Sequence, residues 1–108
     1  MKVFYNINVQ MTTTEVDNTV LESAAHHLGF LKKDVETDTY CFNAFYAGEI
    51  TPVHMRERVR QFLSENTNVY YVDVMYRYEY AMVPDRFVTW QDGSHHEYTG
   101  HIEFREDI

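Results

Sequence analysis

The chain has 108 residues, of which 44% are hydrophobic and 16% aromatic, so it carries enough apolar surface to fold as a single domain over residues 1–108. Its 17 acidic and 9 basic residues give a formal net charge of −8, which repels phosphates and weighs against a general nucleic-acid binder. No apolar run has the length of a bilayer span, and the first residues alternate in polarity instead of forming the apolar block of a signal peptide. Cys41 is the single cysteine, which excludes an internal disulfide. We therefore expect a cytoplasmic protein that contacts no membrane.

The first third of the chain predicts a strand followed by a helix. Residues 2–11 alternate in polarity, and their apolar face is formed by Val3, Tyr5, Ile7, Val9 and Met11. Residues 15–28 have apolar side chains at helical spacing, Thr14 and Asp17 resemble a capping box at the start, and Gly29 suits a left-handed cap at the end.

The middle of the chain predicts one or two strands and a second helix. Residues 30–36 are ambiguous between a short edge strand and a loop, whereas residues 39–47 are rich in strand formers. Thr51 and Pro52 are a typical N-cap and first helical residue. The inner stripe of the second helix is then predicted to be Val53, Met55, Val59, Phe62 and Leu63.

The longest predicted strand covers residues 68–82. Its even positions form an apolar face that we expect to be packed: Tyr70, Val72, Val74, Tyr76, Tyr78, Tyr80 and Met82. Its odd positions mix charged side chains with Tyr71 and Met75 and are expected to face water. A short strand over residues 86–90, a turn with Asp92 and Gly93, and a last strand over residues 97–105 form a terminal hairpin.

These elements predict an α+β fold with two helices on one face of a four- to five-stranded, mainly antiparallel sheet. If residues 30–36 form a strand, the order is the ferredoxin-like βαββαβ, extended by a C-terminal hairpin. If they form a loop, the alternative is βαβαββ. Either fold hosts many unrelated functions, so the fold class alone predicts none.

The C-terminal histidines are the main candidates for metal chemistry. Imidazole groups from His95, His96 and His101 could bind zinc or another divalent ion. Neighbouring side chains of a strand point to opposite faces, however, so His95 and His96 cannot easily share one ion. The sequence contains no other catalytic or cofactor motif, so we expect no cofactor and no enzymatic activity.

The open face of the predicted sheet is the stronger candidate for a binding site. Phe4, Tyr71, Met75 and Arg77 are expected to lie on it, and residues of these types are enriched at protein interfaces. Such a face could dock a partner protein or a second copy of the chain. We expect direct nucleic-acid binding to be absent.

A compact, acidic, tyrosine-rich chain without a catalytic motif resembles in composition the small inhibitors that viruses and mobile elements encode against host defence or nucleic-acid-processing proteins. The expected partner is then a protein, including the class of basic nucleic-acid-binding proteins, and the acidic residues expected to contact it are Asp34, Glu36, Asp38, Glu106 and Asp107. Two alternatives are open: a small metal-dependent enzyme or metal-binding module that uses the histidine hairpin, and a ferredoxin-like ligand-binding regulatory domain.

Overall fold

The computed structural model describes residues 1–13, 15–30, 32–34, 40–92 and 94–98, and only the backbone of residues 32–34, 97 and 98. Along the chain these residues form β1 (Val3–Met11), α1 (Asn18–Leu28), β2 (Lys32–Asp34), β3 (Cys41–Gly48), α2 (Pro52–Glu65), β4 (Val69–Tyr78), β5 (Asp85–Trp90) and β6 (His95–Tyr98). The predicted strand-helix-strand-strand-helix-strand order is present, and β5 and β6 form the terminal hairpin. β6 begins at His95, two residues earlier than predicted, and residues 99–105 of the predicted last strand lie outside the described residues.

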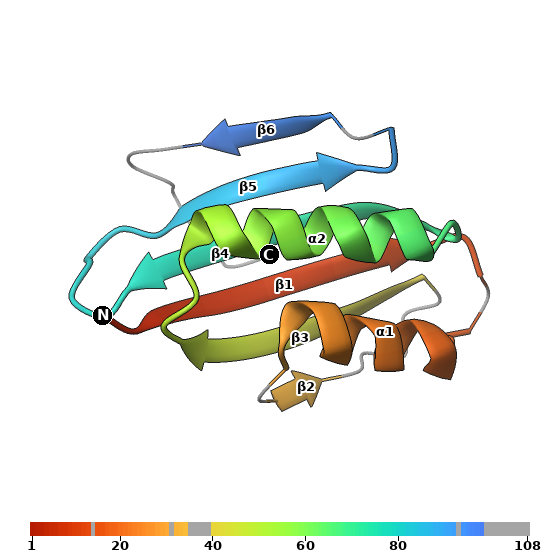
Figure 1. Ribbon diagram of the computed structural model, residues 1–108, viewed down its shortest axis with the longest axis horizontal. Helices are drawn as coiled ribbons and strands as arrows, with labels where there is room; N and C mark the ends of the chain where they lie inside the picture. The colour runs from red at the N-terminus through yellow and green to blue at the C-terminus, as the bar shows by residue number, and fades with distance from the viewer. Residues whose placement is uncertain (14, 31, 35–39, 93, 99–108) are drawn as a thin grey trace.

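The strands form one antiparallel sheet in the order β2-β3-β1-β4-β5-β6, with β1 near its centre (Figure 1). The order of the first four strands is consistent with the ferredoxin-like plan, so the predicted fold class is confirmed, with six strands instead of four or five. The ambiguous residues 30–36 contain β2, which pairs with β3, and the βαβαββ alternative is therefore wrong. The strand is only three residues long, which explains why the pattern of polarity could not identify it.

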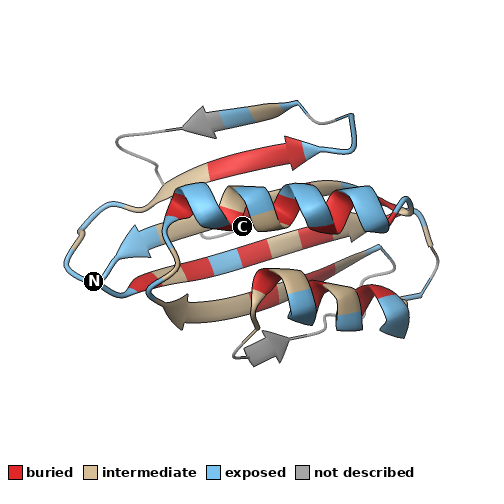
Figure 2. Ribbon diagram, viewed as in Figure 1, coloured by how far each residue is buried: buried red, intermediate tan, exposed pale blue. Residues whose placement is uncertain are grey.

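Both helices cover the same face of the sheet, and the buried side chains lie between the two layers (Figures 1 and 2). The largest side chains with no exposed surface are Phe42, Phe62, Phe87, Ile7, Met11, Leu28 and Met55. Each such side chain contributes about 1.5–3 kcal/mol of burial free energy. Neither of the described helices lies on the opposite face of the sheet.

The first helix begins later than predicted. Its N-cap is Asp17, whose carboxylate accepts a hydrogen bond from the backbone nitrogen of Thr19 at 2.8 Å, so the capping box with Thr14 is wrong, and Thr14 itself lies outside the described residues. The C-cap prediction is confirmed: Gly29 has φ of 68° and its N–H donates to the carbonyl of Ala25.

The second helix begins as predicted, with Thr51 as the N-cap and Pro52 in the first turn. The predicted inner stripe is right except for Val53, which is 60% exposed. At roughly 100° per residue, Val53 lies about 160° from Met55 around the helix axis, and therefore on the side that faces away from the sheet.

A register shift changes the start of β4. Val69 pairs with Met11 and Tyr71 pairs with Gln10, so Tyr70 is an extra residue opposite that step of β1. Val69 consequently enters the core, while Tyr70 is exposed. The prediction that Tyr70 is packed was wrong because a strict period of two does not survive a bulge.

The end of β4 also differs from the prediction. The strand ends at Tyr78, four residues before Met82, and the N–H of Ala81 donates to the carbonyl of Tyr78 as the chain turns. Tyr78, Tyr80 and Met82 were predicted to be packed, but all three are exposed. Tyr78 is the last residue of β4 that pairs with β1, and beyond it no described strand fixes the alternation of side chains.

Candidate functional site

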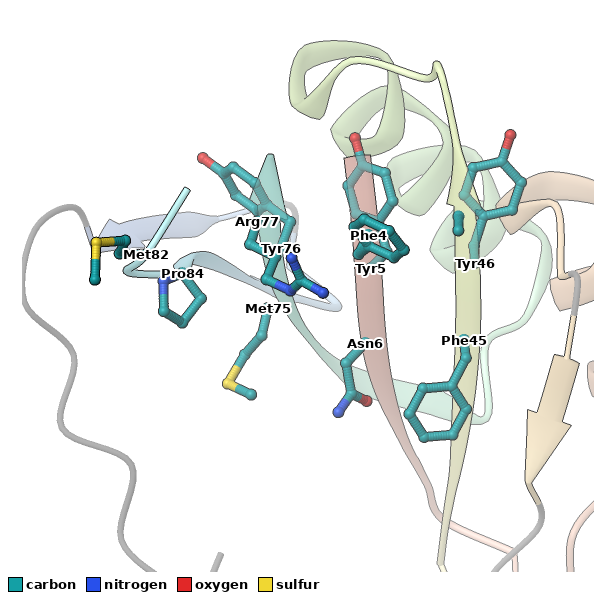
Figure 3. Close-up of a pocket in the computed structure, with 11 residues that line it drawn as sticks. Phe4, Tyr5, Asn6, Phe45, Tyr46, Met75, Tyr76, Arg77, Met82 and Pro84 are labelled. Atoms are coloured by element: carbon teal, nitrogen blue, oxygen red, sulfur yellow. The ribbon is translucent and has the colours of Figure 1, made fainter. Parts of the chain in front are cut away.

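A hollow of about 590 Å³ lies on the sheet face opposite α1 and α2 (Figure 3). It is bordered by residues of β1, β3 and β4 and by the loop between β4 and β5, and we define it by Phe4, Asn6, Phe45, Met75, Arg77, Met82 and Pro84. Most of these side chains are apolar. Among the described residues that border it, none is acidic and Arg77 is the one with a positive charge.

Strand register brings these side chains together. Phe4 pairs with Arg77 on one side, and Asn6 pairs with Met75 on one side and with Phe45 on the other. Because residues directly opposite each other in a sheet point to the same face, these side chains form two adjacent rows across three strands. The hollow is therefore positioned by the central, most fully paired part of the sheet.

The residues between these rows point toward the helices and hold the sheet from behind. Tyr5, Tyr46 and Tyr76 lie on that side (Figure 3), and the ring centroid of Tyr5 is 6.0 Å from each of the other two. The hydroxyl of Tyr5 donates to the carbonyl of Ile50. Burial raises the pKa of Tyr5 and, less strongly, that of Tyr76, so both side chains stay neutral at physiological pH.

The guanidinium of Arg77 lies over a neighbouring aromatic ring. Its guanidinium carbon lies 4.3 Å from the centroid of Phe4, a cation–π contact that fixes the direction of the side chain. Neither Arg77 nor Asn6 forms a side-chain ion pair or hydrogen bond with another described residue, and both are exposed. Their N–H groups are therefore available to a bound molecule.

The loop between β4 and β5 extends the apolar surface beyond the hollow. Tyr80 is 82% exposed and Met82 is 97% exposed, and Val83 between Met82 and Pro84 is exposed as well. Large apolar side chains that are exposed together beside a hollow are typical of a docking surface.

The opposite end of the same face has a different character. Tyr71 packs edge-on against Trp90 with ring centroids 4.8 Å apart. Between this pair and the hollow, Asn8 donates to the side chain of Asn43 at 3.0 Å, and Gln10 contacts Asn8 at 3.4 Å. The free face therefore has an apolar end at the hollow and an amide-rich end beside Trp90.

The residues predicted for the open face lie on it, but they do not form one site. Phe4, Met75 and Arg77 meet in the hollow, whereas Tyr71 is six residues from Arg77 along β4, which is about 20 Å. Asn6, Phe45, Met82 and Pro84 also border the hollow and were not predicted as site residues. Phe45 could have been found from its parity in β3, because residues 43, 45 and 47 share a face, but Met82 had been assigned to the packed side.

The predicted acidic contacts are placed only in part. Asp34 is in β2 at the edge of the sheet, opposite Asn43. Glu36, Asp38, Glu106 and Asp107 lie outside the described residues.

An unpredicted ion pair lies on the open face between the hollow and Trp90. Asp73 Oδ1 is 3.5 Å from Arg86 Nε. Asp73 of β4 is paired with Val88 of β5, and Arg86 lies two residues before Val88, so the ion pair runs diagonally across the two strands. Burial raises the pKa of Asp73, and the attraction of Arg86 opposes this shift without cancelling it.

The candidate metal ligands do not converge in the part of the chain that the structure describes. His95 and His96 begin β6 on opposite faces, as expected from strand geometry, and His95 Nδ1 lies 3.2 Å from Arg60 Nη2. His101 lies outside the described residues. Within residues 1–98, the described positions contain no group of three or more histidine, cysteine, aspartate or glutamate side chains able to hold a metal ion.

Comparison of the chain with protein-family models, with curated proteins and with solved structures gave no significant match. Neither of the described helices has the length and apolar composition needed to cross a bilayer. Functional conclusions therefore depend on the chemistry of the open face.

Proposed function

We propose that this chain is a non-enzymatic protein-binding module whose docking surface is the hollow together with Tyr80 and Met82 of the adjacent loop. The main support for the proposal is the hollow itself, an apolar depression on the sheet face opposite the two described helices. Sheet positions hold Phe4, Asn6, Phe45, Met75 and Arg77, so a partner does not have to order this part of the hollow on binding.

The energetics suit insertion of one or two apolar side chains from a partner. Burying one such side chain contributes about 1.5–3 kcal/mol, and covering the exposed Met82 adds a similar amount. Phe4, Met75 and Arg77 would surround the inserted group, and apolar anchors in a pocket beside an arginine are typical of the residues that dominate interface energies.

Charge favours a basic partner. The net charge of −8 increases the encounter rate with proteins of net positive charge and opposes the approach of a second copy of the same chain. Within this proposal the chain acts in the cytoplasm as a small inhibitor, encoded by a virus or a mobile element, of a basic host protein in defence or nucleic-acid processing. Composition and charge support this more specific role.

The hollow also favours a second candidate function, that of a ligand-binding regulatory domain. Its volume of about 590 Å³ lies within the range of small-molecule pockets. It opens broadly on the sheet face, which suits a protein segment better, because small ligands are usually enclosed on most sides.

The test is capture from a nuclease-treated lysate of the cell in which the protein is naturally made, with three forms of the chain. Met82→Asp places a charge in the docking surface at a position that is 97% exposed, so the fold should be unaffected. Val53→Asp makes the same change on the outer side of α2 and is the matched control.

We expect one protein of net positive charge, close to equal stoichiometry, to be retained by the wild type and by Val53→Asp and lost by Met82→Asp. Equal retention by all three forms would contradict docking at this surface. Mass measurement of the free chain adds a check: a stable dimer that Met82→Asp dissociates would replace the partner by a second copy.

A further inference from the structure

The charge of the hollow is opposite to that of the chain. The whole sequence has 17 acidic and 9 basic residues, yet the described residues that border the hollow include Arg77 and no acid. A partner seated in the hollow therefore meets a positive charge inside an apolar surface, while the rest of the molecule is negative.

The position of Arg77 suits hydrogen bonding to a carboxylate of a bound partner. The guanidinium carbon lies 4.3 Å from the centroid of the Phe4 ring, and no described residue forms a hydrogen bond or ion pair with its N–H groups. A guanidinium held in this way loses little conformational entropy when it binds a carboxylate through two parallel hydrogen bonds. Asn6, in the neighbouring row, offers an amide N–H₂ on the same face.

We infer that the hollow recognises a partner segment in which an apolar side chain lies next to a carboxylate. The apolar side chain contacts Phe45, Met75 and Met82, and the carboxylate accepts hydrogen bonds from Arg77. This inference rests on the proposed function, because it specifies the chemistry of the segment that the docking surface takes.

A local carboxylate is compatible with a partner that is basic overall. Net charge acts over a Debye length of about 8–10 Å and mainly affects the encounter, whereas the pair with Arg77 forms at contact. A phosphate fits less well than a carboxylate: it carries up to two negative charges, and phosphate-recognition sites usually bring several arginines together. The described border of the hollow supplies one.

Methionine methyl groups give a direct readout in the full chain. The protein contains five methionines; Met75 and Met82 border the hollow, whereas Met11 and Met55 are fully buried in the core and serve as internal references. With ¹³C-methyl methionine labelling, we would titrate two capped tetrapeptides, glycine-phenylalanine-aspartate-glycine and its counterpart with asparagine in place of aspartate.

We expect both peptides to shift the methyl signals of Met75 and Met82 and to leave those of Met11 and Met55 in place. The aspartate peptide should bind about fivefold more tightly, the gain expected of one exposed, well-oriented ion pair. Arg77→Gln should abolish this difference and Arg77→Lys should reduce it. Arg60→Gln, which removes an exposed arginine of α2 that faces Glu57, should preserve it.

Three results would overturn the inference. If both peptides bind equally to the wild type, the hollow takes apolar segments without selecting a carboxylate, and the proposed function still stands. If Arg77→Gln retains the difference, another group makes the selection. If neither peptide shifts the methyl signals of Met75 or Met82, the hollow does not bind such segments, and the proposed function loses its main support as well.

Discussion

Replacing Tyr5 by phenylalanine should change how the stability of the protein depends on pH. Tyr5 is 3% exposed, its ring lies between those of Tyr46 and Tyr76 behind the hollow, and its hydroxyl donates to the carbonyl of Ile50. Phenylalanine keeps the ring and removes the hydroxyl, which costs about 1 kcal/mol of unfolding free energy at pH 7, the usual net value of one hydrogen bond.

The difference between the two proteins should disappear in alkali. The folded state raises the pKa of Tyr5 well above its usual value near 10, mainly by burial. Its stability contribution is therefore fully present below pH 10 and is lost as the pH rises, because the unfolded chain releases the phenolic proton and the folded chain holds it. With the proton retained in the folded state, the loss reaches about 1.4 kcal/mol at pH 11. Phenylalanine has no proton to lose, so Tyr5→Phe and the wild type should be about equally stable near pH 11.

Urea unfolding at pH 7 and pH 11 measures both free energies. Ionisation of Tyr76, whose pKa is also raised, is common to both proteins and cancels in the difference. Tyr80→Phe changes an exposed hydroxyl and should leave the unfolding free energy unchanged at both pH values. A gap between wild type and Tyr5→Phe that stays the same from pH 7 to pH 11 would refute the reasoning.

Two further substitutions test the fold and the open face. Gly29→Ala should lower the unfolding free energy by about 1 kcal/mol, because φ is 68° at this position and the added Cβ would lie 3.2 Å from both Arg58 and the ring of Tyr46. Urea unfolding measures this loss, and an unchanged unfolding free energy would contradict the left-handed cap. Asp73→Asn should be at least as stable as the wild type at pH 7, because burial raises the Asp73 pKa despite Arg86, so folding disfavours the ionised carboxylate relative to the unfolded chain and a neutral amide avoids this cost. The advantage should disappear below about pH 3.8, where the carboxyl is neutral in both states, and thermal unfolding at pH 7 and pH 3 would show whether it does.

The sequence predicted the open face well where β1 and β4 pair in regular register. Phe4, Met75 and Arg77 follow from the alternation of β1 and β4, because the burial of Val72, Val74 and Ile7 on the other face fixes the orientation of both strands.

The alternation failed where pairing is irregular or ends. Tyr70 is displaced by a bulge against β1, and Met82 follows the last paired residue of β4, so neither position is specified by a period of two. The hollow needs Met82 as its outer wall. The hollow could therefore not be derived from the pattern, although Phe4, Met75 and Arg77, three of its seven defining residues, were predicted to share a face.

The accessibility of Met82 in the complex tests the account most directly. Mild peroxide oxidation followed by mass spectrometry should modify Met82 readily in the free chain, where it is 97% exposed, and should spare the buried Met11 and Met55. With the captured partner bound, we predict strong protection of Met82 and none with an unrelated basic protein at the same concentration. Oxidation of Met82 at the same rate in the free and bound chain would contradict docking at the hollow.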